Sequence, residues 1–220
     1  MKEKTKEINS KQIKKTFQLI QQAGTLMQMP RQHTKHLGNT FDTVASHSFH
    51  VSVIAYCIAR MEGLSQERAS KSALMGLLHD LVEARTGDLD FVGKHYSQSN
   101  EEKAVIDQFS GTPFSDDLIN LIGEYEDRES LESKCAKDAD SLEQMYLEWT
   151  LSWQGNKLAQ RWIDGDYKDR VPYMKTDSAK KLALEMKRSN PQDWWWSQFV
   201  KSDGTAKNLE KLLGKKYNQK

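Results

Sequence analysis

Apolar residues recur every three or four positions along most of this chain, which is the spacing that places side chains on one face of an α-helix. A clear example runs from His47 through Val51, Ile54 and Ile58, at steps of four, three and four residues. No segment shows the convincing alternation of apolar and polar residues that a half-buried strand requires. The pattern therefore predicts an all-α fold.

Proline, glycine and capping residues bound the expected helices. These helices cover Ile8–Met27, Thr43–Glu62, Gln66–Glu83, Asn100–Phe109, Phe114–Asp127, Leu131–Trp153, Ser178–Arg188 and Ala206–Leu213. Neither an internal repeat nor a low-complexity linker divides the chain. We therefore expect a single domain over residues 1–220, with a helical-bundle core at about 16–153 and additional helices in a C-terminal extension at about 154–220.

Length and composition limit the classes of partner. The 220 residues, 37% of them hydrophobic, are enough to bury one core. Lys and Arg number 32 and Asp and Glu 31, so the net charge of +1 does not favour a nucleic acid polymer as partner. No stretch approaches the roughly 18 apolar residues of a membrane span, and the start lacks the apolar segment of a secretion signal. We expect a cytoplasmic protein with no membrane partner.

The only cysteines are Cys57 and Cys135, and they do not have the Cys-x-x-Cys spacing of a metal site. Both fall inside expected helices. Buried thiols in a reducing compartment are the expectation.

Histidines and aspartates interrupt two apolar helical segments. His47 shares a face with apolar residues and is expected to point inward, while His79 and Asp80 directly follow the apolar run from Ala73 to Leu78. A buried carboxylate is costly unless it is paired. A cation is the simplest partner, and the alternative for each histidine is a hydrogen-bonded core residue.

Within the expected helix, His79 and Glu83 are four residues apart and lie on one side, while Asp80 lies about 100° around the axis. The helix thus offers two candidate ligands and a further carboxylate. The pattern is not His-Glu-x-x-His, which removes the main support for a zinc protease.

A longer motif extends these residues. It comprises His47, then His79-Asp80-x-x-Glu83-x-x-Thr86-Gly87-Asp88-Leu89, then Glu124-Tyr125-Glu126 and Lys137-x-x-Asp140-x-Leu142. In order and spacing this motif resembles the HD superfamily of metal-dependent phosphohydrolases. Within it, the chain is similar to the 5′-deoxynucleotidases, over roughly residues 16–153.

The resemblance implies one divalent metal ion held by His47, His79, Asp80 and Asp140. It also implies that Asp138 is a solvated or supporting carboxylate. Mixed nitrogen and oxygen ligands suit Mn, Co, Fe, Zn or Mg, so the sequence leaves the metal open.

Three further residues follow from the resemblance and from phosphoryl chemistry. Glu83 is expected to orient or deprotonate the attacking water, or to protonate the leaving sugar oxygen. Arg31 is expected to bind the phosphate. The resemblance also implies that Asp88, in a Thr-Gly-Asp turn, approaches the sugar 3′-hydroxyl and helps to favour deoxyribose. The alternative for Glu83 is a helix carboxylate paired with Arg85 or a lysine. The alternative for Arg31 is a surface arginine, and that for Asp88 is an aspartate that caps a helix or forms a turn.

The chain departs from the family pattern at several positions. Gln32, rather than a tryptophan, follows Arg31, and Ser46 stands where an acidic residue precedes the first histidine. Asp90 and Phe91 replace a proline and a small polar residue. If the missing acid normally supports the ligands, its absence would alter metal affinity or water positioning.

We therefore expect an enzyme that hydrolyses nucleotide phosphomonoesters, with deoxynucleoside 5′-monophosphates as the leading substrates. The alternatives are hydrolysis of nucleoside triphosphates or cyclic nucleotides, and a catalytically weak metal- and nucleotide-binding regulatory protein. The resembling proteins commonly form homodimers, so a homodimer is expected here. Trp194-Trp195-Trp196 is expected to pack on the core or at a subunit contact.

Overall fold

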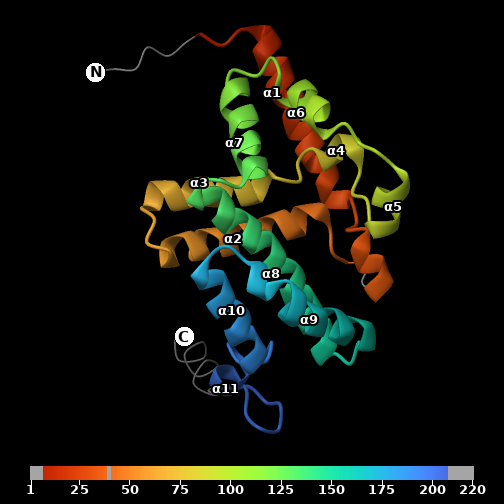
Figure 1. The fold of residues 1–220 in the computed structure, drawn as a ribbon, viewed down its shortest axis with the longest axis vertical. Coiled ribbons are helices and arrows are strands. Elements are labelled where there is room, and N and C mark those ends of the chain that lie inside the picture. The colour runs from red at the N-terminus through yellow and green to blue at the C-terminus, as the bar shows by residue number, and fades with distance from the viewer. Residues whose placement is uncertain (1–6, 39–40, 208–220) are drawn as a thin grey trace, which may run out of the picture.

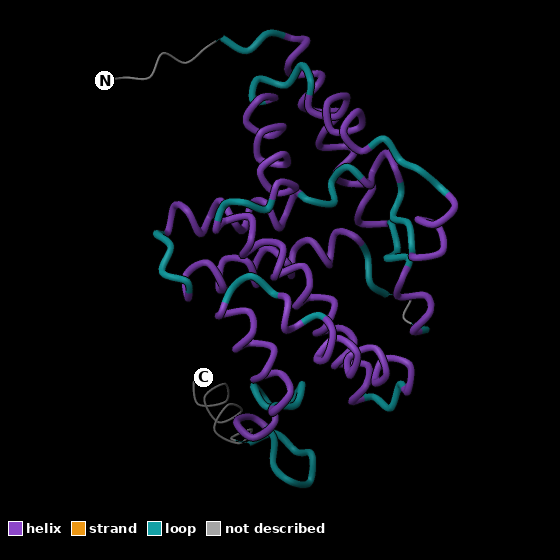
Figure 2. Tube along the Cα trace, in the orientation of Figure 1, coloured by secondary structure: helices purple, strands orange, loops and turns teal. Residues whose placement is uncertain are grey.

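The computed structural model describes residues 7–38 and 41–207, which form an assembly of helices (Figure 1). The longer helices are α1 (Ser10–Thr25), α2 (Val44–Met61), α3 (Gln66–Leu78), α6 (Glu101–Phe109), α7 (Ser115–Asp127), α8 (Leu131–Trp153), α9 (Lys157–Asp169) and α10 (Asp177–Arg188). The shorter ones are α4 (Glu83–Thr86), α5 (Phe91–Tyr96), α11 (Trp196–Phe199) and the 3-10 helices η1 (Leu26–Gln28), η2 (His33–Leu37) and η3 (Val171–Tyr173). Among the described residues two isolated bridges occur but no strand (Figure 2), which confirms the all-α prediction.

Helices α2, α3 and α8 form the centre of the molecule. Each of the three packs against the other two, and α8 also carries α9 and α10. Helices α1, α6 and α7 lie on one side of this centre, and α9, α10 and α11 on the other (Figure 1).

Two hydrophobic clusters hold these parts together. The larger one joins α2, α3, α8, α9 and α10 and is built around residues such as Met75 and Met145. The smaller one includes Val44 at the start of α2 and Phe109 on α6. Leu78 packs against both clusters. The segment that follows Leu78 in the chain therefore begins where the two clusters meet.

Helices α2 and α3 approach closely at Gly76. A Cβ atom on Gly76 would lie 3.0 Å from Cγ1 of Val51 and 3.3 Å from the backbone of Ser52. A side chain here would push the helices apart, and His79 follows three residues later. The absence of a side chain at Gly76 therefore helps to fix the distance between His79 and α2.

The expected helix over Gln66–Glu83 is wrong at its C-terminal end, because α3 ends at Leu78. A continued helix would offer the carbonyl of Gly76 to the N–H of Asp80. Instead, this carbonyl lies 2.9 Å from Nδ1 of His79 and accepts its hydrogen bond. The next backbone bond, from Leu81 N–H to Leu78 O, spans three residues and forms a turn. His79 and Asp80 thus lie in a turn between α3 and α4.

Several other predictions need correction. Cys57 is exposed, whereas Cys135 is buried as expected. Ala206 forms a bridge with Val200 and does not begin a helix, and the remainder of the expected Ala206–Leu213 helix beyond residue 207 lies outside the described residues. Trp194 is 73% exposed, so it does not pack on the core.

Of the described helices, none combines the length and apolar character needed to cross a membrane.

Candidate metal centre

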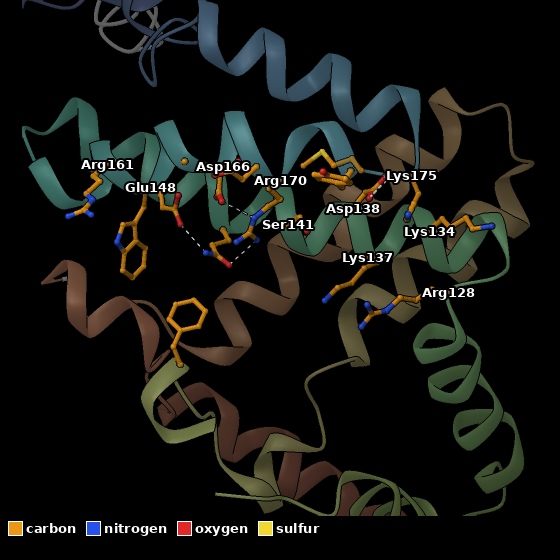
Figure 3. A pocket seen from close by; sticks show the side chains of 17 residues that line it. Arg128, Lys134, Lys137, Asp138, Ser141, Glu148, Arg161, Asp166, Arg170 and Lys175 are labelled. Atoms are coloured by element: carbon orange, nitrogen blue, oxygen red, sulfur yellow. Dashed lines mark hydrogen bonds and ion pairs between the residues drawn. The ribbon is translucent and has the colours of Figure 1, made fainter. Parts of the chain in front are cut away.

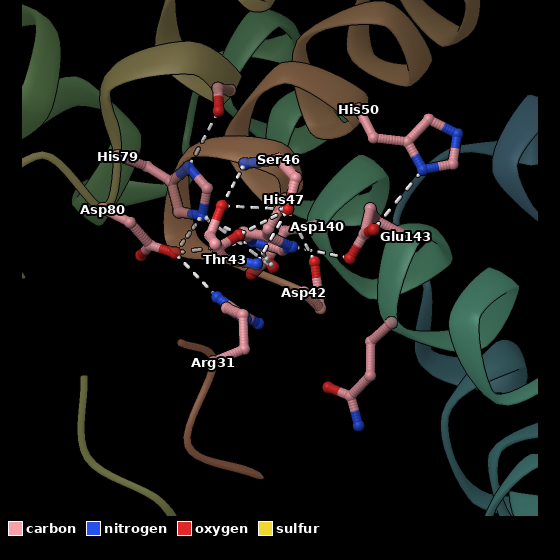
Figure 4. A network of polar contacts seen from close by, with 12 residues as sticks. Arg31, Asp42, Thr43, Ser46, His47, His50, His79, Asp80, Asp140 and Glu143 are labelled. Carbon is pink, nitrogen blue, oxygen red and sulfur yellow. Dashed lines mark hydrogen bonds and ion pairs between the residues drawn. The ribbon is translucent and has the colours of Figure 1, made fainter. Parts of the chain in front are cut away.

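Three distant segments bring four candidate ligands together (Figure 4). His47 comes from the start of α2, His79 and Asp80 from the turn after α3, and Asp140 from the middle of α8. Nε2 of His47 lies 3.4 Å from Nε2 of His79, 3.4 Å from Oδ2 of Asp80 and 3.3 Å from Oδ1 of Asp140. Nε2 of His79 lies 3.2 Å and 3.8 Å from the same two oxygens.

The ligand atoms of His47, His79 and Asp80 all lie within 4.8 Å of one another, and Asp140 places an oxygen near both imidazoles, so these separations fit ligands that share one metal ion. With ligand bonds of about 2.1 Å, neighbouring ligand atoms lie about 3.0 Å apart in an octahedron and about 3.4 Å apart in a tetrahedron. Both imidazoles are buried, and the carboxyl side chains of Asp80 and Asp140 are 18% and 20% exposed. A metal held here would therefore be reached from one side, through the carboxylates.

The protons of the two imidazoles also support this assignment. Nδ1 of His47 lies 2.6 Å from Oε2 of Glu143, and Nδ1 of His79 donates to the carbonyl of Gly76. If Nδ1 carries the proton in each neutral ring, both Nε2 atoms present lone pairs to each other and to two carboxylate oxygens. Such a set of electron donors suits a divalent cation, because otherwise its members repel one another.

The electrostatics of the cluster favour positive charge at the same point. Burial alone would lower the pKa of His47, but hydrogen bonds with Asp140 and Glu143 raise it to about 10. Burial would raise the pKa of Asp80, yet the charges of His79 and His47 lower it, and the pKa of Asp140 is lowered in the same way against the effect of burial. Both carboxylates are therefore ionised at neutral pH.

Glu143 supports the His47 ligand and was not predicted from the sequence. It is buried on α8, and its second carboxylate oxygen lies 3.4 Å from Nδ1 of His50. Burial would raise the pKa of Glu143, but its hydrogen bonds with His47 and His50 lower it to about 2. The available signal was its spacing, because a residue three positions after Asp140 shares its helix face. The supporting carboxylate thus comes from α8.

Ser46, where an acidic residue was expected, serves the helix instead. It forms a capping box with Thr43, in which each side chain bonds the backbone N–H of the other residue. The hydroxyl of Ser46 also donates to Oδ1 of Asp42. These bonds fix the first turn of α2, which carries His47.

Arg31 lies beside the candidate ligands and is buried, so the alternative of a surface arginine is wrong. Met29 and Arg31 exchange backbone bonds with Val44 and Asp42 at the entrance to α2, which positions the arginine next to His47. The guanidinium is buried, and its Nη1 donates to Oδ2 of Asp80 at 3.0 Å. Its Nε is buried with no hydrogen-bond partner in the described structure.

Glu83 lies at the start of α4 and lines the same cavity. Its Oε2 is buried and has no hydrogen-bond partner among the described residues. Burial, followed by the negative charges of Asp80 and Asp88, raises the pKa of Glu83 to about 9. Arg85 instead donates to Gln22, so the alternative of a Glu83–Arg85 pair is wrong.

Asp88 follows the turn at Gly87, which has a φ of +76° that residues with a side chain rarely adopt. Its Oδ2 accepts the backbone N–H of Gln32 at 2.8 Å. This bond ties the Arg31 segment to the turn after α4. Asp88 also lines the cavity, so its structural role in the turn and a binding role are compatible.

A cavity of about 440 Å³ contains these groups. Its lining includes Arg31, Glu83 and Asp88 together with His79, Asp80 and Asp140, so the structure brings six of the seven predicted site residues to one cavity and His47 to its buried edge. Tyr125 also lines the cavity, with its ring 5.3 Å from that of His79. Burial raises the pKa of the Tyr125 hydroxyl, which therefore stays protonated.

Asp138 does not belong to this cluster, and the expectation of a solvated or supporting carboxylate is wrong. It is buried and accepts backbone hydrogen bonds from Lys175 and Thr176 and the hydroxyl of Thr176. Thr176 in turn caps α10. Asp138 therefore anchors the start of α10 to α8.

Comparisons with known proteins identify the family of the domain. A profile of the HD domain matches residues 23–181, which extends past the expected limit at residue 153 to include α9. A crystal structure from a structural-genomics programme is 31% identical, with a TM-score of 0.67 over 83% of this chain and 99% of the other.

A conserved hypothetical protein from Pyrococcus furiosus is 24% identical, with a TM-score of 0.66 over 79% of this chain and 99% of its own. A predicted metal-dependent phosphohydrolase from Magnetospirillum magnetotacticum shares the fold at 20% identity, with a TM-score of 0.57 over 83% and 95%. A search of curated proteins finds no match.

Proposed function

The chain belongs to the HD-domain family of metal-dependent phosphohydrolases, and we propose that it hydrolyses deoxynucleoside 5′-monophosphates to deoxynucleoside and phosphate. The observation that carries the proposal is the meeting of a four-ligand cluster with Arg31, Glu83 and Asp88 in one cavity. These groups supply the three functions that such a reaction needs, namely phosphate binding, proton transfer and recognition of the sugar.

His47, His79, Asp80 and Asp140 would hold the ion. When bound, a divalent metal lowers the pKa of a water ligand and polarises a phosphoryl oxygen. Arg31 binds the phosphate through guanidinium N–H groups that its bond to Asp80 does not use, and it is held in place by that bond.

Glu83 carries out proton transfer in the proposed reaction. Because burial and neighbouring carboxylates raise its pKa to about 9, it is protonated at neutral pH before substrate binds. It gives this proton to O5′ as the P–O5′ bond breaks, while the oxygen of the attacking water forms the new bond to phosphorus on the opposite side; the proton of this water passes to solvent, from which Glu83 is protonated again.

Asp88 recognises the sugar. One of its carboxylate oxygens accepts the N–H of Gln32, and the other accepts a hydrogen bond from the 3′-hydroxyl.

The cytoplasmic location and the homodimer remain predictions from the sequence.

A substrate screen tests the proposed function. The purified protein is assayed with Mn²⁺, Co²⁺, Zn²⁺ and Mg²⁺ against deoxy- and ribonucleoside monophosphates, with triphosphates and cyclic nucleotides as the alternatives. We expect the highest kcat/KM on deoxynucleoside monophosphates. Equal rates on the two sugars would contradict the proposed preference for deoxyribonucleotides, and no turnover of any phosphoester would favour a regulatory binding protein.

The variant Glu83→Gln tests the proton-transfer step. We expect kcat to fall by about 10²–10⁴-fold while one metal ion per chain is retained, because Glu83 transfers protons and is not a ligand. Glu101→Gln is the matched control, since Glu101 lines the same cavity but is exposed. If Glu83→Gln keeps its activity, the assignment of Glu83 is wrong.

A further inference from the structure

A second cavity, of about 700 Å³, adjoins the metal-side cavity (Figure 3). It lies along α8 and α9 and reaches α5 through Phe91. The residues that line both cavities are Phe91, Arg128, Lys137, Ser141, Gln144 and Arg170. The two cavities therefore share a boundary, and Phe91 on this boundary faces the cavity of the metal centre as well as the second one.

We propose that the second cavity receives the base of the nucleotide, which stacks on Phe91 and meets Trp162 at its edge. This inference rests on the proposed function, because it concerns the part of the substrate remote from the phosphate.

The two aromatic rings have a geometry that suits a base. Their centroids lie 6.2 Å apart and their planes are inclined by 75°, so the rings meet edge to face. Phe91 is 62% exposed, which leaves ring surface open for stacking, whereas Trp162 is half-buried on α9. A base placed on Phe91 gains the flat contact that nucleobases make with aromatic side chains.

Phe91 is held firmly even though its ring is exposed. The preceding residue, Asp90, is buried and accepts hydrogen bonds from the N–H of Gly93 at 2.7 Å and from His36 at 2.9 Å. Its carboxylate also pairs with Lys35 at 2.6 Å. These bonds tie α5 to η2, so the position of Phe91 relative to the metal centre is fixed before any ligand binds.

A polar network forms the wall where the two cavities meet. Arg170 donates to Gln144 at 3.2 Å and to Asp166 at 2.9 Å, and Gln144 donates to Glu148 at 2.9 Å (Figure 3). Burial, followed by the charge of Asp166, raises the pKa of Glu148 to about 8. This carboxyl is therefore mostly neutral near pH 7, which reduces the negative charge beside a bound nucleotide.

Charge distinguishes the second cavity from a third one of about 420 Å³, which is lined in part by His79 and lies along α6 and α7. The third cavity contains four carboxylates, and no Lys, Arg, Phe, Tyr or Trp lines it. It would repel a nucleotide and offers no such stacking ring. The second cavity is also lined by four carboxyl groups, but six lysine and arginine side chains outnumber them, and aromatic side chains lie among them.

The experiment compares a substrate that has a base with one that lacks it. The kcat/KM for deoxyadenosine 5′-monophosphate is divided by that for 2-deoxyribose 5-phosphate in wild type, Phe91→Ala and Trp162→Leu. We expect this ratio to fall about tenfold in Phe91→Ala, since stacking of one base contributes about 1–3 kcal/mol. Phe91→Trp should restore the ratio, and Ile106→Ala, in the third cavity, is the matched control.

Binding of deoxyadenosine, measured by calorimetry, separates this inference from the proposed function. We expect Phe91→Ala to weaken deoxyadenosine binding about tenfold as well. If that weakening occurs without any phosphatase activity, the base site stands and the proposed reaction is wrong. If the phosphatase is active but neither the ratio nor the binding changes in Phe91→Ala, the inference is overturned. A loss confined to Ile106→Ala would place the base in the third cavity.

Discussion

Replacement of Glu143 tests how a residue outside the four candidate ligands tunes metal binding through its hydrogen bond to one of them. The carboxylate of Glu143 lies 2.6 Å from Nδ1 of His47, on the opposite side of the ring from the metal-facing Nε2. It fixes the orientation of the imidazole and increases the electron density at Nε2. Removing it should weaken metal binding while leaving all four ligands in place.

The expected size follows from the bond that is lost. A hydrogen bond to a charged group contributes about 1.5–3 kcal/mol, and this one is buried and short. Because 1.4 kcal/mol corresponds to a factor of ten, the dissociation constant of the metal should rise by about 10–100-fold. Glu143→Gln keeps an acceptor but loses the charge, so it should lie near the lower value, and Glu143→Ala near the upper one.

The assay is a competitive titration of Mn²⁺ or Zn²⁺ against a chelator, with thermal unfolding as a check on folding. Glu132→Gln is the matched control, because Glu132 is also a buried glutamate of α8 but pairs with Arg68. A dissociation constant within twofold of wild type in both Glu143 variants would refute the reasoning. A fall in the number of metal ions bound per chain would also refute the reasoning, because Glu143 would then be a ligand.

Two further substitutions test the packing and the pH dependence. Gly76→Ala should lower the free energy of unfolding by about 1–3 kcal/mol, because its Cβ would lie 3.0 Å from Val51. The control Gly24→Ala, whose Cβ meets nothing within 4 Å, should raise the free energy of unfolding slightly. Equal effects of the two substitutions in chemical denaturation would contradict the packing argument. The raised pKa of Glu148 means that the folded protein keeps a proton that the unfolded chain releases above about pH 4.5, so stability should fall as the pH rises from 4.5 to about 8. Glu148→Gln should flatten this part of the curve, and an unchanged slope would show that Glu148 ionises normally.

The sequence predicts most helices well because their buried faces repeat regularly. Helix α8 begins at Leu131 and ends at Trp153 as expected, and α2 differs by one residue at each end. Helix α9 was not predicted, since only Ala159 and Ile163 are buried on it and Gly165 interrupts its pattern. Ala159, Trp162 and Ile163 do recur at helical spacing, but charged and polar residues dominate this helix, so its narrow apolar face was not recognised.

The site shows a similar division. The motif identifies the seven residues that the structure brings together. It does not show that the imidazole of His79 donates a hydrogen bond to the carbonyl of Gly76 at the point where α3 ends. Nor does it reveal Phe91 and Trp162 as neighbours, because their contact joins two helices that are far apart in the sequence. Side-chain bonds to backbone and contacts between distant segments depend on the folded arrangement.

The four donor atoms converge only after α2, the turn beyond α3 and α8 have assembled, so an unfolded polypeptide has no comparable site for the ion. Selective association with the native state adds about 2.7 kcal/mol when the free ion is at a hundred times its dissociation constant. Resistance to heat and to proteases is thereby linked to the supply of divalent ions. A medium without these ions should shorten the lifetime of the folded protein as well as remove its activity.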